Sequence, residues 1–310
     1  MNPALILPWV LAILSVVHPS LCGAQQPLQL KEENKFSGLL ERGLEPSGVT
    51  VLDDAYYVVF DNRRAIGQLH RTLIDDDATH QLIGGSGEQG FEGITYDETS
   101  QRFFTVIETT RQGERLGSSI VTLDRTLNVL TEKPTRGITF THDNKGFEGI
   151  AHIRIENELY LLLLCEGNKC TGGKKGRKRG KGRIHVFKER DDHWAHVDKV
   201  KLPRSVDFED YSGLDIRKEQ IAITSQQDAR LWVGEWRSKG TTPTTIDVRI
   251  KGKGDIYRFH EDNDRYCNIE GVSFTDDDTV VLVSDRKKAS DPDRCNDKDQ
   301  SIHVFSRRDR

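Results

Sequence analysis

The chain has 310 residues, of which 35% are hydrophobic, 30% are charged and 7% are aromatic. This composition excludes an integral membrane bundle and a wholly disordered chain, and it is typical of a soluble globular protein. The formal net charge of −4 gives no general reason to expect a polyanionic partner such as nucleic acid, so contact with a polyanion would have to be local.

The N-terminal segment has the pattern of a secretory signal. No Lys, Arg, Asp or Glu precedes Lys31, and residues 4–17 form an apolar run that is too short to span a bilayer comfortably. We therefore predict a signal peptide over residues 1–24 and a mature domain over residues 25–310 without a transmembrane segment. An uncleaved anchor is the alternative. The predicted location is extracellular, or periplasmic if the source is bacterial.

A short turn followed by Gly and an aliphatic residue occurs five times along the mature domain. The copies are Pro46-Ser47-Gly48-Val49, Phe91-Glu92-Gly93-Ile94, Phe147-Glu148-Gly149-Ile150, Tyr211-Ser212-Gly213-Leu214 and Ile269-Glu270-Gly271-Val272. Their glycines are 45, 56, 64 and 58 residues apart, by subtraction of positions 48, 93, 149, 213 and 271. This spacing fits the four-stranded blades of a β-propeller with loops of variable length.

The sequence inside each repeat predicts strands. A β-rich run follows each motif, at residues 56–60, 103–107, 159–164, 220–224 and 279–283, and a further run follows most of these. Helical periodicity is not sustained anywhere in the mature domain. We predict an all-β fold, a single β-propeller with five blades. Six blades are the alternative if the stretch 174–203 or 239–266 holds a degenerate repeat.

The last repeat is short, because only 39 residues separate Gly271 from Arg310. A closed ring must complete this blade, so we predict that the segment Leu28–Leu40 supplies its outer strand. Such closure removes an exposed sheet edge, which would otherwise favour aggregation.

Four cysteines remain in the mature domain, an even number in a chain predicted to enter an oxidising compartment. Of the three possible pairings we favour Cys165–Cys170 with Cys267–Cys295, because each bond closes one local loop. The Cys-x4-Cys spacing also occurs in zinc sites, but no second close pair or His-x3-His accompanies it, so zinc bound through sulfur is disfavoured.

Propeller geometry predicts two rings of side chains on one face, because the start of each innermost strand meets the end of the next strand there. The first ring is Ser47, Glu92, Glu148, Ser212 and Glu270. The second ring is Asp61, Glu108, Glu166, Gln227 and Asp285.

The three glutamates of the first ring predict a cation. Like charges converging in a partly desolvated channel repel, so they require raised pKa values or a compensating ion. Ca²⁺ accepts carboxylate, hydroxyl and carbonyl oxygens in loose geometry, so we predict that it is held by Glu92, Glu148 and Glu270 with Ser47 and Ser212. The alternative is that each glutamate accepts backbone N–H groups from an adjacent blade. The second-ring acids are either further functional groups or solvated strand ends.

The repeated Glu-Gly-aliphatic start is accompanied by Asp61-Asn62-Arg63, Glu108-Thr109-Thr110-Arg111 and Ser284-Asp285-Arg286 at strand ends. Over residues 44–310 this pattern resembles the phytase-like and SdiA-regulated group of secreted β-propellers. The resemblance implies five or six blades and Ca²⁺ near the channel, with Glu92, Glu148 and Glu270 as central ligands and Glu108 and Asp285 near the mouth. Ser47 and Ser212 depart from an acidic pattern, which argues against a multi-calcium centre of true phytase type.

Residues 174–183 form a strongly basic insertion in the third repeat. Its seven basic residues are Lys174, Lys175, Arg177, Lys178, Arg179, Lys181 and Arg183. Glycines and like charges predict a flexible, extended loop that is either a solvated insertion or a contact for a sulfated glycan, an acidic polysaccharide or an anionic lipid surface. Nucleic acid is not predicted, because no aromatic platform accompanies the charges.

Two functions remain open from the sequence. The first is a Ca²⁺-dependent hydrolase of phosphoesters or esters, in which Glu108 and Asp285 act as catalytic carboxylates and Arg111 and Arg286, with Arg63, bind a small anionic substrate. The second is a non-enzymatic extracellular module that binds an acidic glycan or a protein partner. A monomer is predicted in either case.

Overall fold

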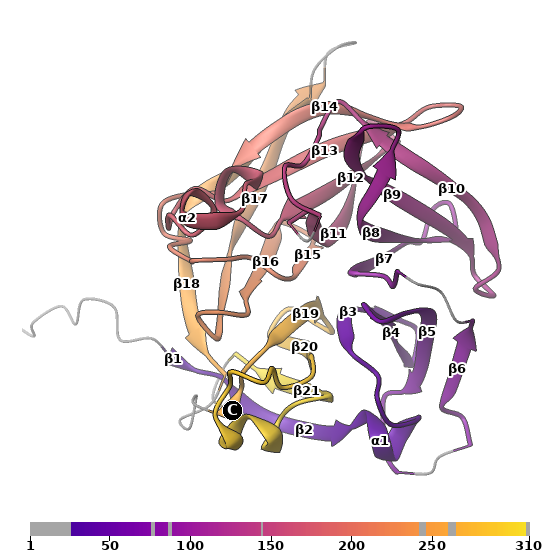
Figure 1. Ribbon diagram of the computed structural model, residues 1–310, viewed down its shortest axis with the longest axis vertical. Helices are drawn as coiled ribbons and strands as arrows, with labels where there is room; N and C mark the ends of the chain where they lie inside the picture. Colours follow the sequence, from indigo (N-terminus) through magenta and orange to yellow (C-terminus); the bar gives the residue numbers. More distant parts are fainter. Residues whose placement is uncertain are drawn as a thin grey trace, which may run out of the picture.

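The computed structural model describes residues 26–75, 78–85, 89–143, 145–241, 246–259 and 265–307. Strands make up nearly all of its regular structure, as the sequence predicts (Figure 1). The helical segments are short, namely α1 (Phe36–Leu39), α2 (Gly173–Gly176) and the 3-10 turns η1 (Asn168–Cys170) and η3 (Asp293–Asp297). No helix in this part of the chain is long and apolar enough to cross a bilayer. The predicted signal peptide lies outside the described residues.

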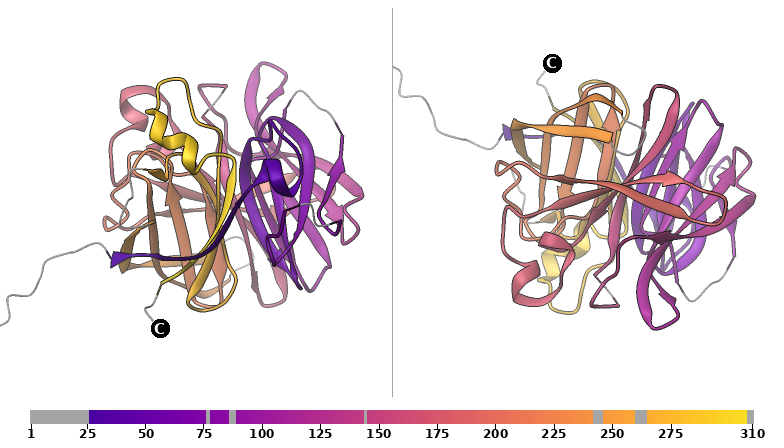
Figure 2. Two further views of the ribbon diagram at one scale, coloured as in Figure 1. Left: turned by 90° about the horizontal axis from the view of Figure 1, so that it is seen from below. Right: turned by 90° about the horizontal axis from the view of Figure 1, so that it is seen from above.

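Each repeat folds as an antiparallel meander, and the meanders are arranged radially around a channel, which is the architecture of a β-propeller (Figures 1 and 2). The first two contain β3 (Pro46–Leu52), β4 (Ala55–Phe60), β5 (Arg63–His70) and β6 (Gln81–Gly84), then β7 (Gly93–Asp97), β8 (Arg102–Gln112), β9 (Arg115–Asp124) and β10 (Val129–Arg136). The next two contain β11 (Phe147–Ile155), β12 (Glu158–Cys165), β13 (Arg183–Glu189) and β14 (Trp194–Lys201), then β15 (Leu214–Arg217), β16 (Gln220–Ser225), β17 (Arg230–Thr241) and β18 (Ile246–Arg258). The last contains β19 (Ile269–Phe274), β20 (Thr279–Ser284), β21 (Ser301–Ser306) and the N-terminal β2 (Gln29–Lys35).

Two further pairings link these meanders. A short parallel pairing of β10 with β14 joins the second and third into one eight-stranded sheet, and β1 (Gln26–Pro27) adds to β18. The stretches 174–203 and 239–266, which could have held a further repeat, supply β13, β14 and part of β17 and β18 in the described residues. They therefore extend existing sheets.

The glycines of the repeated motif are the points where neighbouring innermost strands meet. A Cβ at Gly213 would lie 2.3 Å from the Glu270 carbonyl oxygen, and one at Gly48 would lie 2.7 Å from the Glu92 carbonyl oxygen. Equivalent close approaches link Gly93 to Glu148, Gly149 to Leu214 and Gly271 to Ser47. The contacts thus run around the channel and return to the first repeat, and any side chain larger than glycine would force the strands apart.

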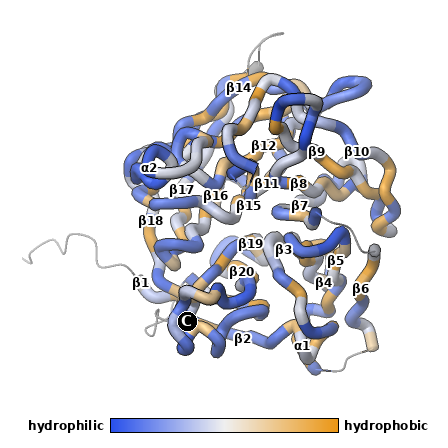
Figure 3. Tube along the Cα trace, in the orientation of Figure 1, coloured by the Kyte–Doolittle hydropathy of each residue, from blue (hydrophilic) through white to orange (hydrophobic). Residues whose placement is uncertain are grey.

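The hydrophobic core is divided into five clusters of buried side chains, each formed between two neighbouring meanders. Tyr57 and Val59 of β4, for example, pack against Phe103 and Ile107 of β8. Because each sheet packs against neighbours on both of its faces, its second strand is buried along most of its length, as in β4, β12 and β20. Figure 3 shows hydrophobic segments distributed around the whole ring.

The predicted N-terminal closing strand is confirmed, since β2 pairs antiparallel with β21 from Gln29–Ser306 to Lys35–Ser301. The strand ends earlier than predicted because α1 begins at Phe36.

A buried chain of hydrogen bonds ties this strand to the sheet. His303 Nε2 lies 2.7 Å from Ser284 Oγ, and Nδ1 lies 3.2 Å from Glu33 Oε2. The hydrogen bond with His303 lowers the pKa of Glu33 to about 2. Because Ser284 is fully buried, this Ser–His–Glu arrangement is structural and does not present a nucleophile to solvent.

Both predicted disulfides are confirmed. Cys165–Cys170 ties the end of β12 to η1, and Cys267–Cys295 ties the entry of β19 to η3. Paired cysteines are typical of proteins that fold in an oxidising compartment. With its sulfurs in disulfides, this set of cysteines offers no thiolate to zinc.

Candidate metal centre

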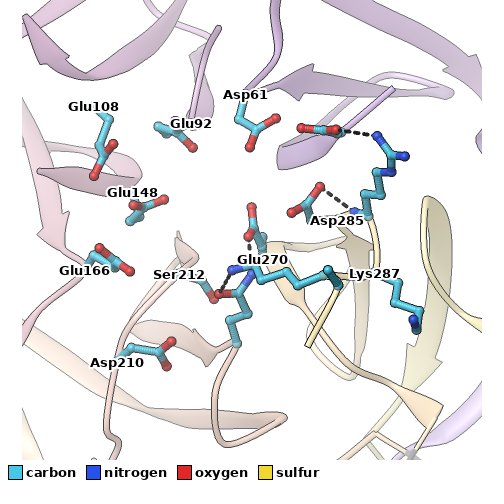
Figure 4. Close-up of a pocket in the computed structure, with 15 residues that line it drawn as sticks. Asp61, Glu92, Glu108, Glu148, Glu166, Asp210, Ser212, Glu270, Asp285 and Lys287 are labelled. Atoms are coloured by element: carbon cyan, nitrogen blue, oxygen red, sulfur yellow. Dashed lines mark hydrogen bonds and ion pairs between the residues drawn. The ribbon is translucent and has the colours of Figure 1, made fainter. Parts of the chain in front are cut away.

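A cavity of about 670 Å³ opens at the end of the channel where the innermost strands begin and the second strands end (Figure 4). Nine carboxylic acids line it: Glu45, Asp61, Glu92, Glu108, Glu148, Glu166, Asp210, Glu270 and Asp285. The basic residues in the lining are Arg286, Lys287 and Lys288. The cavity therefore holds a large excess of acidic groups in a partly enclosed space.

The structure brings the three predicted first-ring glutamates to this cavity. The Glu148 carboxyl lies within hydrogen-bonding reach of those of Glu92 and Glu108. Glu270, which is buried, accepts a hydrogen bond from Gln226 Nε2. Burial, followed by the charge of neighbouring acids, raises the pKa of Glu92 to about 8 and holds the pKa values of Glu148 and Glu270 well above the usual range.

The two serines of the first ring have partners of their own. Ser47 Oγ donates to Glu92 Oε2 at 2.8 Å, and Ser47 is buried in the narrow part of the channel below the cavity. Ser212 lines the cavity, with its Oγ 3.0 Å from the Ile269 carbonyl oxygen and 3.1 Å from Thr224 Oγ1. Both hydroxyls thus join neighbouring blades, whatever else their lone pairs bind.

The acids fall into two groups whose oxygens lie within 4.8 Å of one another. One is Glu108, Glu148 and Glu166, and the other is Glu45, Asp61 and Asp285. Figure 4 shows Glu108, Glu148 and Glu166 on one side of the cavity and Asp61 and Asp285 on the other, with Glu270 between them. The structure therefore mixes the two predicted rings, and Glu92 and Glu270 belong to neither group. The reason is the order around the ring: a serine-bearing repeat separates Glu270 from Glu92 on one side and from Glu148 on the other.

Two acids of the cavity, Glu45 and Asp210, were not predicted. Each lies two residues before the serine of a repeat whose first-ring residue is Ser, and the other three repeats have Gly or Asn at that position. The two repeats that have serine in the first ring thus place a carboxylic acid in the cavity from two residues earlier in the chain. Asp210 accepts hydrogen bonds from Ser225 Oγ and the Gln227 backbone N–H, and burial raises its pKa to about 6.

The second ring is placed largely as predicted. Asp61, Glu108, Glu166 and Asp285 line the cavity, whereas the fourth repeat contributes Gln226 in place of Gln227. Gln227 lines an adjoining groove, because β16 ends at Ser225 and the chain turns there.

Only one of the three predicted anion-binding arginines lines the cavity. Arg286 lies 3.4 Å from Glu45 Oε1 and has a side chain that is 64% exposed. Arg63 is paired with Glu41, and the exposed Arg111 lies on β8 away from the lining residues. The neighbouring Lys288 was not predicted.

The lysines in and beside the cavity differ in their partners. Lys288 Nζ donates to Gln226 Oε1 at 3.0 Å, whereas Lys287 points away from the carboxylates in Figure 4. Lys145 Nζ donates to both Glu166 oxygens at 2.5 Å. These ammonium groups offset only part of the acidic excess.

The raised pKa values predict an unusual pH dependence of stability. Burial also raises the pKa of Asp61 to about 8. Such a carboxyl binds more protons in the folded chain than in the unfolded chain. Its contribution to the free energy of unfolding is therefore complete below about pH 4 and is lost as pH rises towards 8. Without metal, we expect the free energy of unfolding to fall between pH 6.5 and 8, by up to ~1.4 kcal/mol per pH unit for each group that titrates.

Urea unfolding in EDTA at pH 6.5, 7, 7.5 and 8 measures this slope. Below about pH 7.5 the buried His185 and His303, whose pKa values burial lowers, oppose this slope, because their side chains in the unfolded chain bind protons around pH 6.5. The window in which the slope is read is therefore pH 7.5 to 8. A free energy of unfolding that is constant or increases across the window would contradict the prediction.

The basic insertion lies on the face that carries the acidic cavity. Its first turn forms α2, which lies on the same side as η3 in Figure 2, so the loop is less extended than predicted. Lys174, Lys175, Arg177 and Lys178 are exposed. Arg179 is bound to Asp228 at 2.6 Å, and Arg183 donates to the carbonyl oxygens of Lys181 and Gly182.

A groove of about 450 Å³ separates the insertion from the acidic cavity. Lys174 and Arg177 line it together with Lys145, and it shares Glu166, Asp210, Gln226 and Lys288 with the cavity. The two hollows are therefore continuous.

No family model matches the chain, and no curated protein matches it. Among solved structures it is similar to the GH43_1 enzyme from Xanthomonas citri, with a TM-score of 0.50 and 8% identity over 88% of this chain and 90% of that one. The same enzyme complexed with xylose gives the same TM-score and identity, with 88% of each chain covered. The PQQ-bound aldose sugar dehydrogenase from Streptomyces coelicolor gives a TM-score of 0.43 and 10% identity over 89% of this chain and 98% of that one. At such identities the likeness concerns the fold alone, and the resemblance to the phytase-like group stays a prediction. The chain has the fold of a β-propeller.

Proposed function

We propose that the protein is a secreted, five-bladed β-propeller that binds Ca²⁺ in the acidic cavity and hydrolyses phosphoesters or esters of a small anionic substrate. The observation that carries the proposal is the convergence of nine carboxylic acids on one cavity, six of them in two groups with oxygens within 4.8 Å. The closed cycle of glycine contacts supports five blades. The two disulfides support the secretory route.

The donor set fits a hard cation. Every acidic group in the lining offers carboxylate oxygen, and no His or Cys of the described residues lines the cavity. Ca²⁺ takes six to eight oxygen ligands in flexible geometry, whereas Zn²⁺ prefers nitrogen and sulfur. Glu108, Glu148 and Glu166 would hold one ion, and Glu45, Asp61 and Asp285 would hold another. Glu45 and Asp210 supply carboxylates in the two repeats whose first-ring residue is Ser47 or Ser212. The departure of these serines from an acidic pattern therefore no longer argues against more than one ion.

When bound, Ca²⁺ supplies positive charge that attracts an anionic substrate and offsets charge that develops in the reaction. The chain's own cations complete the anion site, since the exposed Arg286 and Lys288 lie on one wall of the cavity. A guanidinium matches two oxygens of a phosphate or carboxylate group, so Arg286 is suited to orient the substrate.

Asp210 is the best-placed general base. It lines the cavity and belongs to neither metal-binding group, so it is not needed as a ligand, and its oxygens keep lone pairs beyond the hydrogen bonds that they accept. Its pKa of about 6, raised by burial, lets it accept a proton near neutral pH. The Ser225 hydroxyl and the Gln227 backbone N–H hold its carboxylate in place. Glu108 and Asp285, whose pKa values burial raises to about 7, are the alternative proton carriers.

The test is hydrolysis of p-nitrophenyl phosphate, bis-p-nitrophenyl phosphate and p-nitrophenyl acetate with Ca²⁺ and with EDTA. We expect turnover that requires Ca²⁺ and that Asp210→Asn reduces about 100-fold or more, in line with removal of a general base. Asp207→Asn, an exposed carboxylate three residues earlier, is the matched control. Folded, Ca²⁺-loaded protein without turnover on all three substrates would rule out the hydrolase.

The second candidate is a non-enzymatic module that binds an acidic glycan. The exposed cations of the insertion, at the edge of the groove, favour it. Replacing Lys174, Lys175, Arg177 and Lys178 together with Ala is expected to remove retention on a heparin column, because local cations carry polyanion binding in a chain of net negative charge. A control variant with the same charge change replaces the exposed Lys199, Lys201, Arg249 and Lys253. Equal elution of the two variants would count against this candidate.

A further inference from the structure

A second cavity lies at the opposite end of the channel. Its volume is about 350 Å³, and all five innermost strands contribute to its lining, for example Asp97 at the end of β7 and Phe274 at the end of β19. These strands begin at the acidic cavity and end at this second one, so the two cavities lie on opposite faces of the propeller. Between them the channel narrows at the motif glycines to a space of about 10 Å³, which allows no small molecule to pass.

The wall of this lower cavity is a fixed polar framework. The Asp97 carboxylate, whose side chain is only 2% exposed, accepts hydrogen bonds from Arg154 Nε at 2.9 Å and Nη2 at 2.6 Å, and also from Ser100. Asp215 accepts from the Phe274 backbone N–H at 2.7 Å. These carboxylates are thus fully engaged and hold the surrounding side chains in place.

Within the described residues, two polar groups of this framework, the Nε2 of His152 and the hydroxyl of Thr50, lack a hydrogen-bond partner. His152 Nδ1 lies 2.8 Å from Thr95 Oγ1, but Nε2 lies 3.9 Å from Asp97 Oδ1, beyond hydrogen-bonding distance. The hydroxyl of Thr50, a residue only 6% exposed, makes no hydrogen bond within the described part of the chain. Both groups line the cavity, so each can bond a ligand there.

The charges of the lining residues point to a neutral ligand. Three acids, Asp97, Glu98 and Asp215, face three bases, Arg154, Arg217 and Lys218. Arg154 is bound to Asp97, and Arg217 and Lys218 share Asp277. Acids and bases are therefore balanced in number around this cavity, which offers a phosphate or a metal ion no excess of charge like that of the cavity on the other face.

An aromatic ring lies at the edge of the site. Trp236 is partly buried and lines the cavity, and its Nε1 donates to the Lys218 carbonyl oxygen at 2.7 Å, which fixes the plane of the ring. A rigid aromatic surface beside a few placed polar groups is the usual composition of a small-molecule site. A sugar ring suits both features, because it combines an apolar C–H face with hydroxyls that donate and accept hydrogen bonds.

We propose that the lower cavity is a second ligand site that binds a small neutral sugar against Trp236, with hydrogen bonds to His152 and Thr50. The volume lies in the range of ligand sites, roughly 300 to 1,000 Å³. This site is independent of the acidic cavity and does not require Ca²⁺.

The test is saturation-transfer-difference NMR in EDTA with glucose, galactose, mannose, xylose and cellobiose as probes. We expect transfer to at least one of them, reduced fivefold or more by Trp236→Ala and by His152→Leu. Arg237→Ala, on the neighbouring exposed position of β17, and Glu148→Gln, in the acidic cavity, should leave it unchanged. Near-UV circular dichroism establishes that each variant is folded, and His152→Leu suffices if Trp236→Ala does not fold.

Two results would overturn the proposal. One is the absence of transfer from folded wild-type protein to all five sugars. The other is transfer that persists in the folded variants of the lower cavity or disappears in Glu148→Gln, since either outcome places the sugar elsewhere.

Discussion

Glu148→Gln is expected to abolish most of the stabilisation by the Ca²⁺ ion that Glu108, Glu148 and Glu166 would hold and, at the same time, to make the metal-free protein more stable at pH 8. Glu148 lies within reach of Glu92, Glu108 and Glu166, so its charge opposes folding unless a cation is present. A neutral amide removes that repulsion but also removes a ligand. The two effects therefore have opposite signs, and loss of a structural contact alone would produce only a decrease.

Thermal unfolding with and without Ca²⁺ measures both effects. At a free Ca²⁺ concentration about 100 times Kd, each bound ion should add roughly 2.7 kcal/mol to the stability of the wild-type protein, and the variant should need at least tenfold more Ca²⁺ to recover the contribution of this site. Glu158→Gln removes an exposed carboxylate from the neighbouring strand β12 and serves as the control. A variant that keeps the full Ca²⁺ response would place the ion elsewhere.

Gly213→Ala is expected to have the largest effect on stability of a methyl group added at any of the five motif glycines. The new Cβ would lie 2.3 Å from the Glu270 carbonyl oxygen and 2.5 Å from Thr224 Oγ1, and neither can move without disturbing the bond between them. Relief requires two innermost strands to separate, which disrupts the ring on both sides. We expect a loss of about 3 kcal/mol or more in the free energy of unfolding.

The matched control is Gly252→Ala in β18, where an added Cβ would meet no atom within 4 Å. Urea denaturation of the two variants compares them directly. Equal stabilities would mean that the motif glycines are not selected by close approach, and the explanation of the repeat would then be wrong.

The repeat made much of the fold predictable, because a motif that places Gly at each crossing of innermost strands leaves a periodic trace in the sequence. The disulfides and the closing strand followed from local spacing and from the short final repeat. The short α2 could not be foreseen in the same way. Its basic insertion is held by Glu209 and Asp228, which belong to the following repeat, so its conformation depends on tertiary contacts.

The candidate site was predictable in composition but not in grouping. Glu92, Glu148 and Glu270 were found because they occupy equivalent positions in the repeat. Glu45 and Asp210 were missed because they lie two residues earlier, and only a comparison of the serine-bearing repeats reveals them. Which acids come within 4.8 Å depends on how adjacent sheets twist against each other, and sequence periodicity carries no information about that angle.

The pairing of β2 with β21 sets the order of events during synthesis. β2 precedes the other strands of the ring and its partner β21 follows them, so the ring stays open until β21 has been made. Until then β2 is unpaired, and β21 of another molecule fits it equally well. At a high concentration of chains whose ring is still open, molecules would therefore be prone to exchange this strand and form domain-swapped dimers.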